Sequence, residues 1–131
     1  MNSQQNSEAF SNKERAVSFL VQVAGGEVRE AYERYVRSDF SHHNPYFRGD
    51  KDSLMSAMEE DAAKNPRKTL EVHRAIEEKD MVVVHSHIKQ QQDDTGVAVV
   101  HIMRFEGGKI VELWDIGQPL PEDSPNENGA F

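Results

Sequence analysis

The hydrophobic pattern of this chain changes its period once, and that change limits the folds that the chain can adopt. Between residues 11 and 64, apolar side chains recur every three or four positions, as they do along one face of a helix. From residue 68 to residue 117 they alternate with polar residues instead, as they do in half-buried strands. Helices followed by strands with short turns indicate an α+β fold and not a doubly wound parallel sheet.

Three helices are expected in the first half of the chain. The first begins at a capping box, because Ser11 and Glu14 have Ser-x-x-Glu spacing, and it ends at Gly25. The second carries apolar residues of the range 28–36 on one face, and the third ends before Pro66.

Residues 40–48 read FSHHNPYFR, and Pro45 argues against a regular element there. The segment is richer in aromatic residues and histidines than an ordinary linker. Two interpretations remain open at this point. Asn44 before Pro45 is a routine way to begin a turn, or the segment closes over a cavity.

Four strands are expected in the second half. They cover 68–77, 81–91, 97–106 and 109–117, and Gly107-Gly108 forms a two-residue hairpin loop between the last two. On the first of them Leu70, Val72 and Ile76 are expected to share one face. Strands this long must twist and curl, so the helices are expected to cover the concave face of the sheet.

His101 and Asp115 are the polar residues that the apolar strands explain least well. His101 interrupts the run VAVVHIMRF, where it is either a hydrogen-bonded core histidine or a group that faces a pocket. Asp115 follows Trp114 near the end of the last strand. In a dry pocket a carboxylate gains proton affinity, as a general acid/base requires. The alternative is a strand-end aspartate that bonds to the backbone or to Arg104.

The register of the last hairpin separates these two residues. With a simple two-residue turn, His101 pairs with Trp114 and Asp115 pairs with Val100, so His101 and Asp115 point to opposite faces. A β-bulge in either strand would place them on the same face, because one extra residue reverses the alternation. The sequence does not reveal a bulge.

His85 and His87 share one face of a strand and have three possible roles. They line the pocket, or they lie on a solvated outer face, or they bind a metal ion. A metal site needs at least one further ligand, and the sequence singles out none. No metal and no cofactor are therefore expected.

Composition narrows the range of partners. The net charge of −8 disfavours binding to a phosphate backbone, so no nucleic acid is expected. The chain has no cysteine, and it has no apolar run of signal-peptide or membrane-spanning length. We therefore expect a cytoplasmic protein that does not bind membranes. It is expected to form one domain over 11–117, with a disordered tail over 1–10 and a polar tail over 118–131.

Three segments together resemble the SnoaL-like polyketide cyclase family, within the nuclear-transport-factor-2-like superfamily. They are HNP at 43–45, VVHIMRFEGGKIVELWDIGQPLP at 99–121 and NENGAF at 126–131. The nearest branch is that of the predicted aldol-condensation-catalysing proteins. The resemblance implies a cone-shaped curved sheet, antiparallel or mixed, wrapped around the three helices with an internal cavity. It further implies a homodimer, no cofactor, and a C-terminal tail packed on the domain through Leu120 and Phe131.

The same resemblance implies roles for individual residues. Asp115 matches the aspartate that serves as acid/base in the characterised cyclases, and His43 faces inward from the loop. Two positions depart from the family. His101 stands where relatives often carry Asp, and Leu113 stands where they often carry His.

The resulting expectation is a cofactor-independent acid/base enzyme that acts on a small apolar carbonyl compound. Asp115 removes the proton α to the carbonyl, and His101 or His43 hydrogen-bonds the enolate oxygen. Aldol condensation, isomerisation and dehydration share this step. The pocket walls are expected to include Trp114, Tyr46 and Phe47, with His85 and His87 as further candidates. The alternative is a non-catalytic module that binds a small ligand or serves as a dimer.

Overall fold

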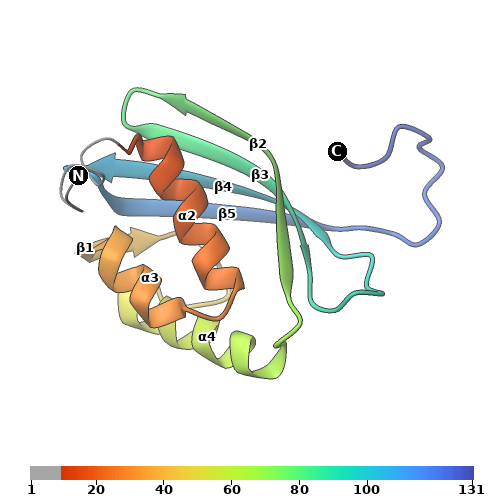
Figure 1. Ribbon diagram of the computed structural model, residues 1–131, viewed down its shortest axis with the longest axis horizontal. Helices are drawn as coiled ribbons and strands as arrows, with labels where there is room; N and C mark the ends of the chain where they lie inside the picture. Colours follow the sequence, from red (N-terminus) through yellow and green to blue (C-terminus); the bar gives the residue numbers. More distant parts are fainter. Residues whose placement is uncertain (1–9) are drawn as a thin grey trace, which may run out of the picture.

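The structure is a computed structural model of the 131-residue chain, and it describes residues 10–131. The disorder predicted for 1–10 lies outside the described residues except at Phe10, which is exposed. The described chain forms three helices and five strands, which confirms the α+β class (Figure 1). In chain order they are α2 (Asn12–Ala24), α3 (Val28–Tyr35), β1 (Val36–His42), α4 (Lys51–Lys64), β2 (Thr69–Glu78), β3 (Met81–Lys89), β4 (Val97–Glu106) and β5 (Lys109–Pro119).

The predicted ends of α2, at Ser11 and Gly25, and the predicted end of α4 before Pro66 lie where expected. Ser11 accepts a hydrogen bond from the backbone N–H of Glu14, and the Glu14 side chain accepts one from the backbone of Ser11, so the capping box is complete. Gly25 caps the C-terminus of α2. Asp50 caps α4, whose C-cap is Asn65.

Strand β1 corrects the expectation that residues from Phe40 onward form no regular element. It pairs in parallel with β5, and the sheet order is β1-β5-β4-β3-β2, with the remaining pairs antiparallel. Val36, Phe40 and His42 are buried along β1 while the positions between them are more exposed. The strand was missed because its apolar positions are few and its partner lies some seventy residues away in sequence.

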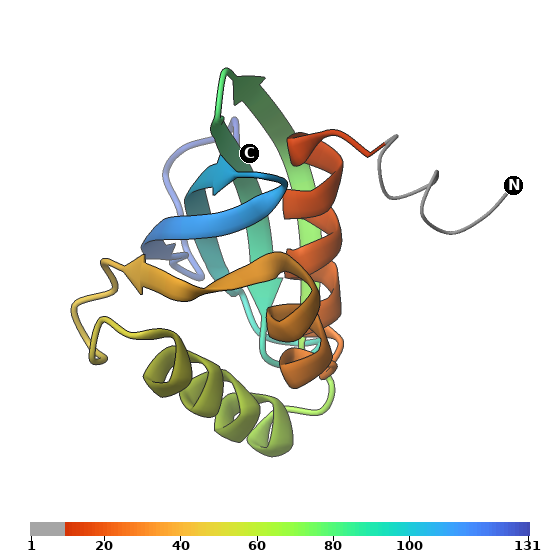
Figure 2. The ribbon, with the colours of Figure 1, turned by 90° about the vertical axis from the view of Figure 1, so that its left-hand side faces the viewer.

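The sheet curves, and the helices lie on its concave side (Figures 1 and 2). Helix α2 crosses β2 and β3, and the C-terminal tail passes over the opposite face (Figure 2). Phe19 of α2 meets Tyr32 of α3 edge to face, with ring centroids 5.1 Å apart. The helices pack on the apolar inner face of the sheet, whose buried members include Val82, Val84, Met103, Phe105 and Leu113.

Two β-bulges, one on β5 and one on β2, shift the alternation within the antiparallel part of the sheet. On β5, Arg104 pairs with Glu112 while Phe105 pairs with Ile110, so Val111 is an extra residue. Ile110 and Val111 are consequently both buried.

The second bulge is on β2, where Val72 pairs with Ser86 and Arg74 pairs with His85. His73 is the extra residue. Beyond it Ala75 packs against the core, and Ile76 is 59% exposed. The expectation that Ile76 shares the face of Leu70 and Val72 is therefore wrong.

Candidate functional site

The bulge at Val111 brings His101 and Asp115 together. They are direct cross-strand partners, and Trp114 pairs with Ile102 instead. The expected pairings of His101 with Trp114 and of Asp115 with Val100 are therefore wrong. Both side chains belong to the inner face of the sheet, next to each other at the centre of the β4–β5 pair.

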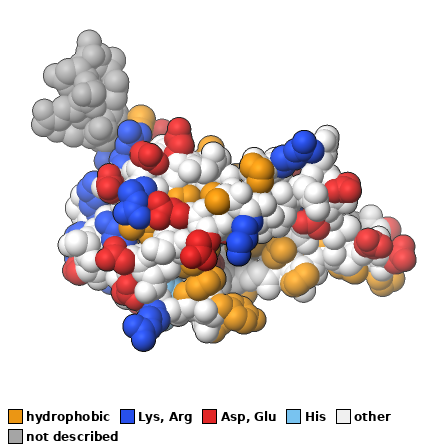
Figure 3. All heavy atoms as spheres, turned by 90° about the horizontal axis from the view of Figure 1, so that it is seen from below, with side chains coloured by type: hydrophobic (Ala, Val, Ile, Leu, Met, Phe, Trp, Pro, Cys, Tyr) orange, Lys and Arg blue, Asp and Glu red, His pale blue; other side chains and the backbone are white. Residues whose placement is uncertain are grey.

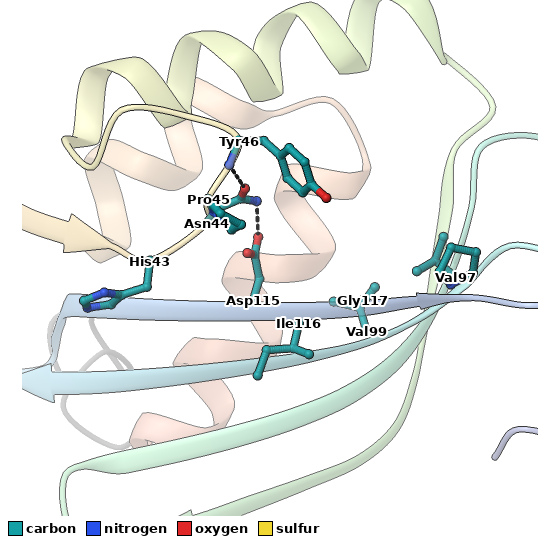
Figure 4. A pocket seen from close by; sticks show the side chains of 10 residues that line it. His43, Asn44, Pro45, Tyr46, Val97, Val99, Asp115, Ile116 and Gly117 are labelled. Atoms are coloured by element: carbon teal, nitrogen blue, oxygen red, sulfur yellow. Dashed lines mark hydrogen bonds between the residues drawn. The ribbon is translucent and has the colours of Figure 1, made fainter.

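Asp115 opens into a pocket of about 590 Å³, a size suited to a small organic molecule. The pocket lies between the loop that follows β1 and the later part of the β4–β5 pair (Figure 4). Its rim is exposed, since Tyr46 is 85% and Ile116 is 60% exposed, so the pocket opens to solvent. The enclosed internal cavity stays a prediction. The lining residues are His43, Asn44, Pro45, Tyr46, Val97, Val99, Asp115, Ile116, Gly117 and Pro119.

Asn44 fixes the carboxylate from the loop side of the pocket. Its Nδ2 donates to Asp115 Oδ2 at 3.1 Å, and its Oδ1 accepts from the backbone N–H of Tyr46 at 3.0 Å (Figure 4). These two partners determine which end of the amide faces Asp115. The other carboxylate oxygen, Oδ1, is buried and has no hydrogen-bond partner within residues 10–131. One oxygen is thus held, and one retains its acceptor capacity.

His42 holds the loop that carries Asn44. Its Nε2 lies 2.5 Å from the Arg48 carbonyl oxygen, which can only accept, so Nε2 carries a proton. Its Nδ1 accepts from the backbone N–H of Asn44 at 3.1 Å. Of this segment, His43 was the predicted site residue, and neither His42 nor Asn44 was predicted. The available signal was the alternation of Phe40 with His42, which places His42 on the buried face of β1.

His101 is kept neutral by its surroundings. Its side chain is buried, and that burial lowers its pKa from 6.5 to about 4; the Asp115 carboxylate acts in the opposite direction, and Lys68 adds to the lowering. Nδ1 is buried without a hydrogen-bond partner in the described part of the chain. At neutral pH the imidazole therefore carries one N–H and one lone pair beside the carboxylate.

Tyr32 of α3 approaches the same carboxylate from the helix layer. Its pKa is raised, first by burial and then by the negative charge of Asp115. The phenol therefore stays protonated. Tyr32 lies close enough to Asp115 to be affected by its charge, and the sequence did not predict it as a site residue.

The other predicted site residues lie elsewhere. His43 borders the pocket, but its Nε2 bonds Glu112 at 2.7 Å and its ring stacks on Trp114 at 4.8 Å, so it points away from Asp115 (Figure 4). Trp114 lies on the outer face with it. Tyr46 lines the pocket, whereas Phe47 is 41% exposed outside the lining set. The structure thus brings His101 to Asp115 and does not bring His43 there.

His85 and His87 lie on the outer face of the sheet. They alternate along β3 with the buried Val84 and Ser86, and the ring of Phe131 lies against both. The one group in the described chain that could hold a metal ion, Glu71 with His73 and His87, is also on this face. The Asp115 pocket and this group are therefore separate.

The surface seen from the side of α4 carries acidic and basic side chains intermixed, and hydrophobic side chains lie in small separate groups between them (Figure 3). This face of the described chain does not show a stripe of basic side chains of the kind that binds nucleic acid. Within residues 10–131, none of the helices is long and apolar enough to cross a membrane.

Comparison with known proteins agrees with the fold. The chain is similar to an NTF2-like protein of unknown function from Cytophaga hutchinsonii, with 19% identity, a TM-score of 0.67, and coverage of 84% of this chain and 92% of that one. It is similar to a proposed isomerase of the SnoaL-like family from Agrobacterium tumefaciens, with 9% identity, a TM-score of 0.70, and coverage of 83% and 99%. It is also similar to a proposed polyketide cyclase from Acidithiobacillus ferrooxidans, with 15% identity, a TM-score of 0.67, and coverage of 83% of this chain and 89% of that one.

The TM-scores establish a shared architecture. The low identities leave the activity of this chain open. No curated protein matches the chain. A family model, described as the SnoaL-like domain, matches residues 18–113 and ends two residues before Asp115. That match covers most of the chain, from α2 to the first half of β5. The chain belongs to the SnoaL-like domain family.

Proposed function

We propose that the chain is an acid/base enzyme that removes a proton from the carbon next to the carbonyl of a small, largely apolar compound, without a cofactor. One observation carries this proposal: the carboxylate of Asp115 lines the pocket and is held in place by Asn44. A base needs an available lone pair within reach of the substrate, and its other oxygen must be oriented. Asn44 orients it at 3.1 Å.

The groups around Asp115 support charge development at the substrate oxygen. The amide of Asn44 has two N–H groups, one of which is used by Asp115, so the other can donate to an enolate oxygen in the pocket. His101 and His43 were the two donors expected for the enolate oxygen. Only His101 lies beside Asp115, because His43 is hydrogen-bonded to Glu112. His101 is buried beside the carboxylate rather than in the pocket wall, so we assign it to supporting Asp115.

The apolar part of the pocket fits the substrate class. Val97, Val99 and Pro119 line the side away from the loop, and Ile116 and Tyr46 form the exposed rim. Two structural neighbours are described as a proposed polyketide cyclase and a proposed isomerase, and cyclisation by aldol condensation and isomerisation are reactions that this proton transfer can begin. The step does not distinguish among aldol condensation, isomerisation and dehydration.

The test is proton exchange in D₂O. Small ketones and β-dicarbonyl compounds are incubated with the protein, and loss of the α-proton signal is followed by NMR. The wild type should accelerate exchange of at least one compound. Asp115→Asn should reduce that rate by at least about 100-fold, because a positioned general base contributes about 10²–10⁴-fold.

Asp123→Asn is the matched control, because Asp123 is an exposed carboxylate of the tail. That variant should exchange at the wild-type rate. Equal rates for the wild type and Asp115→Asn would refute the proposal.

A non-catalytic ligand-binding module is the second candidate, and the solvent-open rim favours it, because an enolate is easily quenched by water. Its signature would be shifts of backbone amides at Asn44 and Ile116 on adding a carbonyl compound, without proton exchange. Dimer formation and a cytoplasmic location stay predictions.

A further inference from the structure

We propose that Glu71, His73 and His87 form a binding site for a transition-metal ion of the Zn²⁺ type on the outer face of the sheet. One possible ligand atom from each of the three lies within 4.8 Å of the others. Two imidazoles and one carboxylate are a donor set that suits Zn²⁺, with a fourth position left to water. Mg²⁺ and Ca²⁺ prefer oxygen ligands and would not be selected here.

The bulge on β2 brings the three residues together. Glu71 is the direct cross-strand partner of His87, so their side chains share one face. His73 is the extra residue of the bulge, and its Nε2 lies 2.9 Å from Glu71 Oε1. The side chain of Glu71 is 73% exposed and that of His73 is 27% exposed, so the group is accessible to an ion from solvent.

The backbone already orients His87 as it would orient a ligand. Its Nε2 lies 2.8 Å from the carbonyl oxygen of Thr95. A carbonyl only accepts, so Nε2 carries the proton and Nδ1 presents its lone pair. An anchor of this kind, from the non-ligating nitrogen to a carbonyl, is usual for metal-bound histidines. Gly96 makes room for the contact, because a Cβ at that position would lie 2.7 Å from His87 Nε2.

Phe131 covers the group without occupying the ligand directions. Its ring is stacked on His73 with centroids 4.2 Å apart and an interplanar angle of 11°, and it lies 4.9 Å from the ring of His87. The lone pairs of imidazole nitrogens lie in the ring plane, so a ring on the imidazole face leaves them free. An apolar cover limits access of water to a metal site.

His85 belongs to the same cluster of rings but not to the site. Its Nδ1 accepts a hydrogen bond from the Arg74 guanidinium. Burial, and then the positive charge of Arg74, lower the pKa of His85. The structure therefore replaces the pair His85 and His87, considered from the sequence, with His87, His73 and Glu71.

The experiment uses the full chain without a histidine tag. Zn²⁺ binding is measured by competition with a chromophoric chelator, and Co²⁺ binding is followed by its visible absorption, which reports coordination geometry. We expect one equivalent of Zn²⁺ per chain, exclusion of Mg²⁺, and a tetrahedral Co²⁺ spectrum. His73→Gln, His87→Gln and Glu71→Gln should each weaken Zn²⁺ binding by at least about tenfold.

His85→Gln is the matched control, because it removes a histidine of the same cluster that is not a ligand. It should bind Zn²⁺ as the wild type does. Circular dichroism checks that each variant is folded, and the side-chain NMR signals of His73 and His87 should move on Zn²⁺ addition to the wild type. Absence of binding would overturn the proposal, as would equal losses in all four variants, which would mean adventitious binding to surface histidines only.

Discussion

The stability of the fold should fall as pH is lowered from 6.5 to 4, because His101 resists protonation in the folded state. Burial lowers its pKa from 6.5 to about 4. A histidine in the unfolded chain takes up a proton near pH 6.5, whereas the folded one does not until about pH 4. Over that interval the unfolded state binds more protons than the folded state. The effect of His101 on the free energy of unfolding is therefore absent at pH 7, and it destabilises the folded state increasingly as pH falls.

The size of the effect follows from the width of the interval. One pKa unit corresponds to about 1.4 kcal/mol, so the loss from this single group reaches about 2 kcal/mol at pH 5 and about 3 kcal/mol at pH 4. That is a large fraction of the 5–15 kcal/mol that is typical of a domain.

Urea denaturation between pH 4 and pH 7.5 measures this loss. The free energy of unfolding of the wild type is compared at each pH with that of His101→Gln, which cannot take up the proton. The difference between the two proteins should change by about 3 kcal/mol across the range. Met103→Leu is the control, because Met103 is fully buried two residues along the same strand and carries no proton. The free energy of unfolding of Met103→Leu should differ from that of the wild type by the same amount at every pH.

Parallel curves for the wild type and His101→Gln would refute this reasoning, and so would an NMR titration of His101 with a midpoint near 6.5. Either result would mean that water or Asp115 compensates the burial of the imidazole, and the neutral histidine used in the proposed function would have to be abandoned.

Three further predictions test the local structure, each by urea denaturation at pH 7. Gly96→Ala should destabilise the fold by about 1–3 kcal/mol or more, because φ is +84° and the new Cβ would lie 2.4 Å from the Ile88 carbonyl oxygen; an unchanged midpoint would contradict that backbone geometry. Val111→Ala should cost about 1.5–3 kcal/mol, because Val111 is 4% exposed and most of its apolar side chain would be removed from the core; an unchanged midpoint would show that this side chain is not buried. Ser11→Ala should cost about 1 kcal/mol through loss of the helix cap, and no loss would mean that the cap is frayed in solution.

Local rules were sufficient for the elements that short-range chemistry determines. Capping residues gave the ends of α2 and α4, and alternation with glycine turns gave β3 and β4 to within a few residues. They failed for β1, whose pairing with β5 joins segments far apart in the chain. The lengths of the strands predicted that the sheet would curl. The family resemblance left the sheet antiparallel or mixed, and the parallel pairing of β1 with β5 makes it mixed.

The site depended on features that residue types do not specify. A bulge is a matter of backbone hydrogen bonding, and many residues can occupy it, so Val111 carries no sequence signature of its own. Its one trace is the pair Ile110 and Val111, which cannot both be buried in a regular strand that faces solvent on one side. Alternation in β1 likewise placed His42, and not His43, on the buried face, although the two histidines are adjacent.

The two bulges act in the same way on opposite faces of the sheet. At Val111 the extra residue turns Asp115 inward beside His101, and at His73 it allows an imidazole to join Glu71 and His87 on the outside. In each case the bulge assembles polar groups whose spacing along the chain would not by itself bring them together. The chemistry of this open sheet therefore depends on where a strand accommodates an extra residue, because the same residues in a regular register would face the other way. Bulge positions, more than residue identities, are where relatives with the same fold should be compared for function.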